Sequence, residues 1–256
     1  MNRRQILTGL AVGASAIALP GLVRAQSAAR VAARNVVLVH GLFADGSCWS
    51  DVIARLQAAG LNATAVQNPL TSFEDSVAAT RRVLAMQDGP TVLVGHSFAG
   101  MIITEAGIDP KVSALVYVAA RAPDANEDYA ALAKTFPTPP ASAGIVWSGD
   151  YGQLGEAAFL RDFAGDLPAE RATVLYAVQE PFNRALTTAR PSVAAWRSKP
   201  SFYAVSSEDR TINPDLERFM AKRMGAKTIE VPASHLSLIS HPDTIANLII
   251  EATRAG

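Results

Sequence analysis

Residues 95–100 (GHSFAG) constrain the fold of this chain more than any other segment. They directly follow the apolar run 91–94 and lead into a stretch that can continue as a helix, so a serine stands at a sharp strand-to-helix turn. The residues two positions before and after such a serine must be small, because the backbone is crowded there. Gly95 and Ala99 meet that requirement. The segment therefore predicts a nucleophile elbow at Ser97, and an ordinary turn after a buried strand is the alternative.

From residue 35 onward, short β-branched runs alternate with longer amphipathic segments, a pattern typical of βαβ units and a mainly parallel sheet. The runs are almost wholly apolar, as in strands that helices cover on both faces. The expected strands are 36–39, 63–66, 91–94, 114–118, 202–205 and 228–231. The expected helices are 48–59, 73–87, 98–108, 214–224 and 242–253. The sequence thus predicts an α/β fold with a mostly parallel, doubly wound sheet of about six strands.

The alternation breaks down in residues 121–196, which are rich in alanine and proline and contain no clear strand. Helices are expected near 154–162 and 169–178. An insertion between two strands of an open α/β sheet lies over the carboxyl ends of the strands, where such sheets bind ligands. We therefore expect a helical cap inserted before the penultimate strand, over a core made of 35–120 and 197–256. Seven large residues of the cap should mainly pack it onto the core, with two or three touching ligand: Phe136, Trp147, Phe159, Phe163, Tyr176, Phe182 and Trp196.

The first 25 residues resemble an export signal. Arg3 and Arg4 precede a mildly apolar run that is too short and too interrupted by glycine and proline to indicate a membrane span. The pattern is similar to a twin-arginine signal, with cleavage expected between Ala25 and Gln26 and a linker over 26–34. We therefore expect the export machinery to bind this segment and the mature protein to be periplasmic or secreted, without stable membrane insertion. An uncleaved N-terminal anchor is the alternative.

Composition narrows the class of protein. The chain has 256 residues, of which 49% are apolar, enough for one globular domain with a large core. The formal net charge is zero, so nothing favours nucleic acid as a partner. Cys48 is the only cysteine and the four histidines are scattered singly, so we expect no disulfide, no metal site and no cofactor. Cys48 is best explained as a small buried filler.

A serine hydroxyl is a poor nucleophile at neutral pH and needs a base that a third group holds in place. His235 follows the last expected strand by a short link, at the same carboxyl edge of the sheet as Ser97. His40 and His96 stand beside the turns at the ends of their own strands, and the ring of His96 is expected to point away from the elbow. His241, next to a proline at a helix start, is a weaker alternative. His235 is therefore the predicted base.

The acid that orients this base is expected on the loop after the preceding strand, residues 206–212. That loop contains two adjacent carboxylates, Glu208 and Asp209, which spacing alone does not separate. An acidic loop that is simply solvated is the alternative. The order serine, acid, histidine along the chain differs from the orders of chymotrypsin and subtilisin.

Two backbone amides are candidates for stabilising the negative charge that develops on a substrate carbonyl. The first expected strand ends in His40-Gly41, and Gly41 allows the chain to bend so that the amide of Leu42 faces the serine. The amide of Phe98, directly after Ser97, is the second predicted donor.

Residues 35–256 resemble the α/β-hydrolase superfamily, in particular the compact branch that contains plant methylesterases, hydroxynitrile lyases and bacterial serine esterases. The matching segments are 40–49 (HGLFADGSCW), 95–100 (GHSFAG), 208–212 (EDRTI) and 233–235 (ASH). The resemblance implies the α/β-hydrolase fold, favours Asp209 over Glu208 as the acid, and supports Leu42 and Phe98 as oxyanion donors. Ala99 stands where glycine is commoner, a tolerable change because alanine is also small.

The same resemblance disfavours some activities of the superfamily. Hydroxynitrile lyases of this type use a lysine after the histidine and a threonine in the oxyanion loop, where this chain has Leu236 and Gly41. Dehalogenases and epoxide hydrolases use an aspartate nucleophile in place of Ser97. We therefore expect a serine hydrolase that cleaves small to medium hydrophobic carboxylic esters through an acyl-enzyme. The alternatives are a non-catalytic small-molecule binding protein, or a cofactor-free perhydrolase or haloperoxidase side activity.

Overall fold

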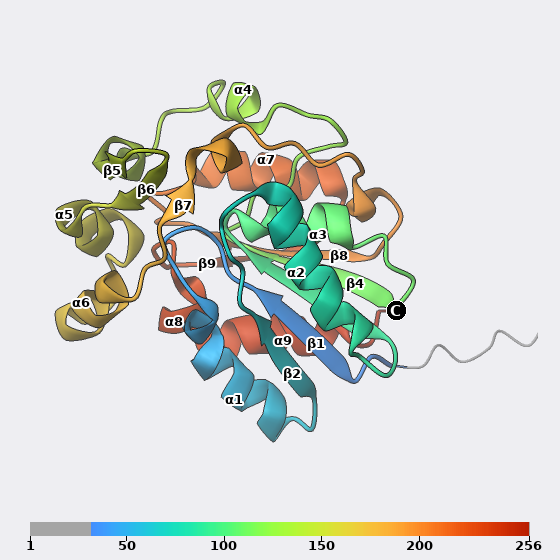
Figure 1. The fold of residues 1–256 in the computed structure, drawn as a ribbon. Coiled ribbons are helices and arrows are strands. Elements are labelled where there is room, and N and C mark those ends of the chain that lie inside the picture. The colour runs from blue at the N-terminus through green and yellow to red at the C-terminus, as the bar shows by residue number, and fades with distance from the viewer. Residues whose placement is uncertain (1–31, 256) are drawn as a thin grey trace, which may run out of the picture. The chain divides into compact units, whose positions relative to one another are not determined.

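The computed structural model describes residues 32–255, so the expected signal peptide, its cleavage site and most of the expected linker lie outside the described residues. A six-stranded parallel sheet occupies the centre, in the order β2-β1-β3-β4-β8-β9 (Figure 1). Its strands are β1 Asn35–Val39, β2 Asn62–Val66, β3 Thr91–His96, β4 Val112–Val118, β8 Ser201–Ser206 and β9 Lys227–Val231. All six strands expected from the sequence are present. Every residue of β1, β3 and β8 is buried, which explains their continuous apolar runs.

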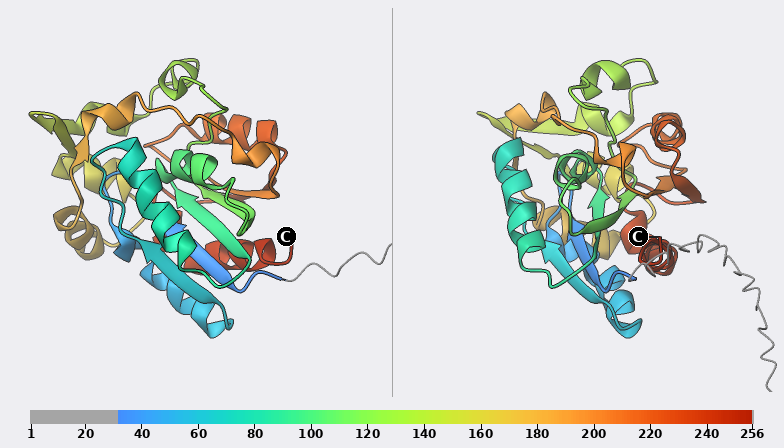
Figure 2. Two further views of the ribbon diagram at one scale, coloured as in Figure 1. Left: turned by 45° about the vertical axis from the view of Figure 1, so that its right-hand side comes forward. Right: turned by 90° about the vertical axis from the view of Figure 1, so that its right-hand side faces the viewer.

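Helices cover both faces of this sheet. They are α1 Ser50–Ala58, α2 Phe73–Ala85, α3 Ala99–Ala106, α7 Pro214–Met224, α8 Ser237–Ser240 and α9 Pro242–Ala252. The pair α1 and α9 packs on one face and the pair α2 and α3 on the other (Figure 2). Their ends carry the expected signals: the Ser72 side chain caps α2, and Asn213 with Pro214 starts α7. Because this is the doubly wound arrangement, the predicted fold class is confirmed.

The strand order places a topological switch point beside the elbow. The chain runs from β1 outward to β2 and then returns to β3 on the other side of β1. The carboxyl ends of β1 and β3 are therefore neighbours, with Val39 opposite Gly95 in the ladder. Ligands of open α/β sheets bind at this kind of crevice.

The cap contains more than the helices that the sequence indicated. Its helices are α4 Tyr129–Ala133, α5 Glu156–Ala158, a π-helical turn Phe159–Phe163, and α6 Ala169–Ala177. It also contains an antiparallel three-stranded sheet of β5 Ile145–Ser148, β6 Tyr151–Leu154 and β7 Phe182–Asn183. Figure 1 shows these elements beside the carboxyl ends of the large sheet. The expectation of a cap without strands is wrong, because each strand is too short for a clear alternation and the hairpin signal at Gly149, which has φ 57°, went unused.

The domain begins slightly before its first strand. Ala33 is buried and its amide donates to the carbonyl of Thr253 at 2.9 Å, so this end of the expected linker is packed against the domain. Within the described range, no helix has the length and apolar character needed to cross a membrane.

Candidate active site

Ser97 has the strained backbone that a nucleophile elbow requires. Its φ of 57° is left-handed, a conformation that costs a non-glycine residue free energy. Two backbone hydrogen bonds hold it: its amide donates to the carbonyl of Val118 at 3.1 Å, and its carbonyl accepts the amide of Arg121 at 2.9 Å. A Cβ on Gly95 would lie 2.8 Å from the carbonyl oxygen of Ala99, so only glycine fits there. The strand, the turn and the helix α3 thus present the serine hydroxyl at the sheet edge.

The structure brings Ser97, His235 and Asp209 into one hydrogen-bonded chain. The Ser97 Oγ lies 2.7 Å from Nε2 of His235, and Nδ1 of His235 lies 2.5 Å from Oδ2 of Asp209. The other carboxylate oxygen of Asp209 accepts the amides of Thr211 at 2.6 Å and Ile212 at 3.0 Å. A carboxylate accepts the Nδ1 proton, so Nε2 is left as the acceptor for the serine hydroxyl. This is the arrangement that proton transfer from a serine requires.

The structure distinguishes between the candidate acids and between the candidate bases that the sequence spacing did not separate. Asp209 is buried against His235, whereas Glu208 is exposed. His241 makes a hydrogen bond to the hydroxyl of Ser240 at 2.9 Å. The structure therefore places Asp209 and His235, and not Glu208 or His241, beside the elbow.

The two candidate oxyanion donors come from neighbouring loops. Gly41 passes so close to the elbow that a Cβ on it would lie 2.6 Å from Cβ of Ser97 and 3.2 Å from the amide nitrogen of Phe98. Neither the Leu42 amide nor the Phe98 amide donates a hydrogen bond to another residue in the range 32–255. Both amides are thus available to a ligand atom.

The two other histidines of this edge fix the backbone around the site. Nε2 of His96 donates to the carbonyl of His235 at 3.0 Å, and the two rings lie 4.7 Å apart. The expectation that the His96 ring points away from the elbow is wrong, since this contact holds the base in place. His40 bonds the Gly41 carbonyl through Nδ1 at 3.0 Å and accepts the Asn68 amide at 2.9 Å. Burial lowers the pKa of both rings, that of His96 strongly, so both are neutral at neutral pH.

Sequence reasoning missed a buried acid that faces Asp209, namely Glu217 on α7. Its Oε2 accepts the amide of Ser206 at 3.1 Å, while its buried Oε1 accepts no hydrogen bond from any donor in residues 32–255. Burial, then the charge of Asp209 and a hydrogen bond between the two carboxyls, raise the pKa of Glu217 well above its usual range. A neutral Glu217 can donate its proton to Asp209. The signal was available in the sequence, because Glu217 stands four residues before Ala221 on the apolar face of the helix.

The cap closes the other side of the site. Oδ1 of Asp162 accepts Nε of Arg210 at 2.7 Å, and the Asp162 carbonyl accepts the hydroxyl of Thr211 at 3.1 Å, so the π-helical turn is tied to the loop of Asp209. The ring of Phe163 lies 5.2 Å from the ring of His235. Ser97 is only 5% exposed, so a substrate must reach it through a narrow opening or after movement of the cap.

Residues suited to other chemistry do not gather in the described chain. Between residues 32 and 255, no three His, Cys, Asp or Glu side chains are placed to hold a metal ion. Cys48 is buried, and burial raises the pKa of its thiol well above the usual range, so it remains protonated. Its role as a buried filler is confirmed.

Comparisons with known proteins show which family this fold belongs to. The model of the alpha/beta hydrolase family matches residues 36–248. The esterase PIR7B of Oryza sativa subsp. japonica is 23% identical over 254 residues, 85% of this chain and 95% of that protein. The carbendazim hydrolyzing esterase of Nocardioides sp. (strain SG-4G) is 36% identical over 126 residues, 44% of this chain and 52% of that protein. Polyneuridine aldehyde esterase has a similar crystal structure, with a TM-score of 0.72 at 20% identity, covering 86% of this chain and 98% of its own.

The family model spans nearly the whole described domain, and the sheet order and the strand-turn-helix of the elbow are those of its fold. The chain belongs to the alpha/beta hydrolase family.

Proposed function

We propose that the protein is a serine esterase that hydrolyses small to medium hydrophobic carboxylic esters through an acyl-enzyme. The observation that carries the proposal is the unbroken hydrogen-bonded chain from Ser97 through His235 to Asp209. The esterases among its relatives support ester hydrolysis as the reaction class. The apolar surroundings of the site, with Phe163 and Leu42 next to it, suit a hydrophobic ester.

Acylation begins at the serine hydroxyl. Ser97 Oγ forms a bond to the ester carbonyl carbon while Nε2 of His235 takes the hydroxyl proton. The tetrahedral intermediate then expels the alcohol, which leaves with that proton. Asp209 does not change its protonation state, but it fixes the tautomer of the imidazole and stabilises the imidazolium.

Deacylation repeats these steps with water as the nucleophile. His235 takes a proton from water, the oxygen attacks the acyl carbon, and Ser97 leaves with the proton as the free acid is released. In both halves the carbonyl oxygen becomes negative, and the Leu42 and Phe98 amides are the proposed donors to it. Loss of one such donor typically costs about 10² to 10³ in rate.

Labelling with a fluorophosphonate probe tests the proposed nucleophile. The intact mass of the protein should increase by one label, and the labelled peptide should contain Ser97. The His235→Ala variant should lose the label while keeping its fold, because the hydroxyl then has no base. A folded wild-type protein that is never labelled, yet binds an apolar ligand, would favour the non-catalytic binding role.

We also propose that the chain is exported by the twin-arginine route, with cleavage between Ala25 and Gln26. Support comes from the sequence alone, namely Arg3 and Arg4 before the short apolar run. Replacing both arginines with lysine should stop export of the folded enzyme. Unchanged export of that variant would contradict the assignment.

A further inference from the structure

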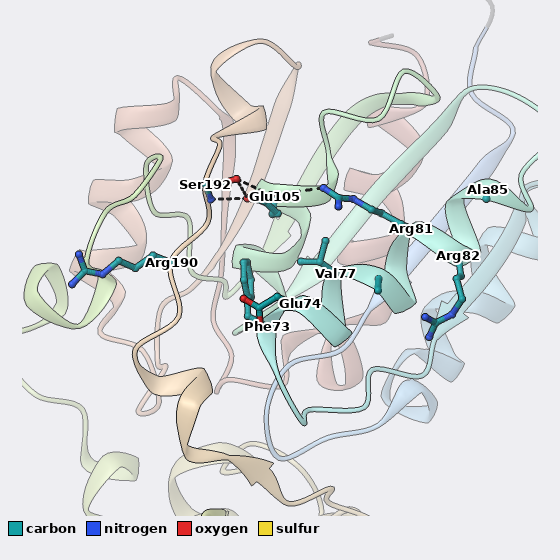
Figure 3. A pocket seen from close by; sticks show the side chains of 10 residues that line it. Phe73, Glu74, Val77, Arg81, Arg82, Ala85, Glu105, Arg190 and Ser192 are labelled. Carbon is teal, nitrogen blue, oxygen red and sulfur yellow. Dashed lines mark hydrogen bonds and ion pairs between the residues drawn. The ribbon is translucent and has the colours of Figure 1, made fainter.

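Two cavities of the described domain contain arginines, and they differ in how those arginines are neutralised. The larger cavity, of about 560 Å³, lies along α2. Figure 3 shows that Arg81 in this cavity faces Glu105. The nitrogen–oxygen distance of this ion pair is 3.7 Å, and the Ser192 hydroxyl donates to the same carboxylate at 2.9 Å. Glu74 also lines this cavity. The other two arginines of this cavity also have acidic neighbours: Arg190 forms an ion pair with Asp128, and Arg82 lies within electrostatic range of Asp75.

The second cavity, of about 250 Å³, lies between α4 and the loop 211–213 that follows Asp209. It contains two cationic side chains, Arg121 and Lys134, and its lining includes no aspartate or glutamate. Apart from the amide of Asn213, the remaining walls are apolar or hydroxylic, with Ala133, Pro139, Thr187 and Ile212 among them.

Arg121 is held in place by aromatic rings. Its guanidinium lies over the ring of Tyr129 at 4.7 Å from the centroid and over the ring of Phe98 at 5.5 Å. Contacts with ring faces leave the in-plane N–H groups free for a planar bidentate partner. Its Nε is buried without a hydrogen bond, and Arg121 makes no ion pair within residues 32–255.

A positive charge that is buried between aromatic rings lowers the stability of the fold unless an anion neutralises it. Burial lowers the pKa of Arg121, but an arginine stays charged at neutral pH. Lys134 adds a second positive charge at the rim of the cavity. It lies within electrostatic range of Asp128, but that carboxylate already forms an ion pair with Arg190. No negative group therefore lines the cavity, and its volume lies just below the usual range of about 300 to 1,000 Å³ for drug-sized ligands, so it suits a smaller molecule.

We propose that this cavity binds the carboxylate of a small organic acid, with the guanidinium of Arg121 holding both oxygens and the apolar walls holding a short hydrocarbon tail. The proposal is independent of ester hydrolysis, because binding requires nothing from Ser97 or His235.

Calorimetric titration of the Ser97→Ala protein with hexanoate tests the proposal, and hexanamide is the neutral control of the same shape. Hexanoate should bind, and hexanamide at least tenfold more weakly. Arg121→Met, which keeps the contacts with both rings, should weaken hexanoate binding at least tenfold. Arg81→Met is the matched control in the other cavity and should leave the affinity unchanged.

Three results would overturn the proposal: no binding of hexanoate, equal binding of the acid and the amide, or unchanged affinity in Arg121→Met. The last would place the acid elsewhere, for example against the amides beside Ser97. Thermal unfolding checks that each variant is folded. If Arg121→Met is not, Arg121→Lys keeps the charge but loses the bidentate geometry, and an unchanged affinity in that variant would equally refute the proposed role.

Discussion

The carboxyl edge of the large sheet and the cap both surround Ser97, but they position their side chains differently. At the edge, Ser97, Asp209 and His235 stand on the loops that follow β3, β8 and β9, so the strand ladders set their positions. The cap reaches the same site mainly through side chains, such as Asp162 bound to Arg210 at 2.7 Å, with one backbone bond from the Ala141 amide to the Arg210 carbonyl at 3.0 Å. We infer that substitutions at the sheet edge abolish catalytic turnover, whereas substitutions in the cap lower its rate only partly.

The largest effect is expected at the edge itself. Ser97→Ala and His235→Ala should each lower kcat for a p-nitrophenyl ester by about 10⁴ to 10⁶, because removing either member disables the whole unit. Ser240→Ala is the control and should retain full activity, because within residues 32–255 the hydroxyl that it removes is bonded to His241 alone. Substantial turnover by folded Ser97→Ala would show that another group is the nucleophile.

The two adjacent carboxylates give the next largest contrast. Asp209→Asn should lower kcat by about 10³ to 10⁴, because the amide no longer selects the productive imidazole tautomer. Glu208→Gln should change it less than about twofold, since that side chain is exposed. Steady-state kinetics of the pair decides the matter, and a larger loss in Glu208→Gln would reverse the assignment.

The edge of the sheet could be predicted from the sequence because its signals are local. A buried parallel strand is a short apolar run, and the residue after it must lie at the carboxyl edge. Ser97 and His235 each follow such a run, so their proximity could be predicted from the expected sheet without knowing which atoms they contact. The spacing could not decide whether Glu208 or Asp209 is the acid, because adjacent residues of one loop follow the same strand of the sheet. Only the burial of Asp209 distinguishes the two carboxylates.

The strands of the cap and the burial of Glu217 were not predicted from the sequence, for a different physical reason. The strand β5 has only four residues, so its alternation is too brief to stand out, and its partners are supplied by long-range pairing. The ring of His96 points toward His235 because of a hydrogen bond between distant segments. Glu217 stands on the apolar face of α7, but only the packing of α7 on β8 shows that it is buried and faces Asp209.

A smaller, graded effect is expected where the cap meets the edge. Asp162 is fully buried and is held by Arg161 at 2.6 Å and by Arg210 at 2.7 Å. Asp162→Asn removes the negative charge, and it leaves one acceptor oxygen for two arginines because its NH2 group cannot accept, so it should lower kcat/KM by about tenfold. Hydrogen exchange should become faster in the loop 206–212, which carries Asp209. Arg161→Gln is the control: it removes the other partner of the same carboxylate, and equal effects in both variants would mean that the bond to Arg210 is not what matters.

The smallest effect on rate, with a clear effect on stability, is expected for Glu217→Gln. Glutamine can still accept from the Ser206 amide and donate to Asp209, so kcat should change by less than about threefold. In the folded wild type, Glu217 keeps its proton above its ordinary pKa of 4.5, where the unfolded chain releases it. The free energy of unfolding of the wild type therefore falls by about 1.4 kcal/mol per pH unit from this group as the pH rises above that value, up to the folded pKa.

Glu217→Gln lacks this proton, so its stability relative to the wild type should increase with pH. Urea unfolding at about pH 5 and at about pH 7 measures the difference, and parallel changes in the two proteins would show that Glu217 is ionised in the folded state. Glu217→Leu completes the comparison, because it fills the space but cannot donate to Asp209. If its kcat falls while that of Glu217→Gln does not, then the edge, like the cap, depends on a side-chain contact that helps to hold its acid.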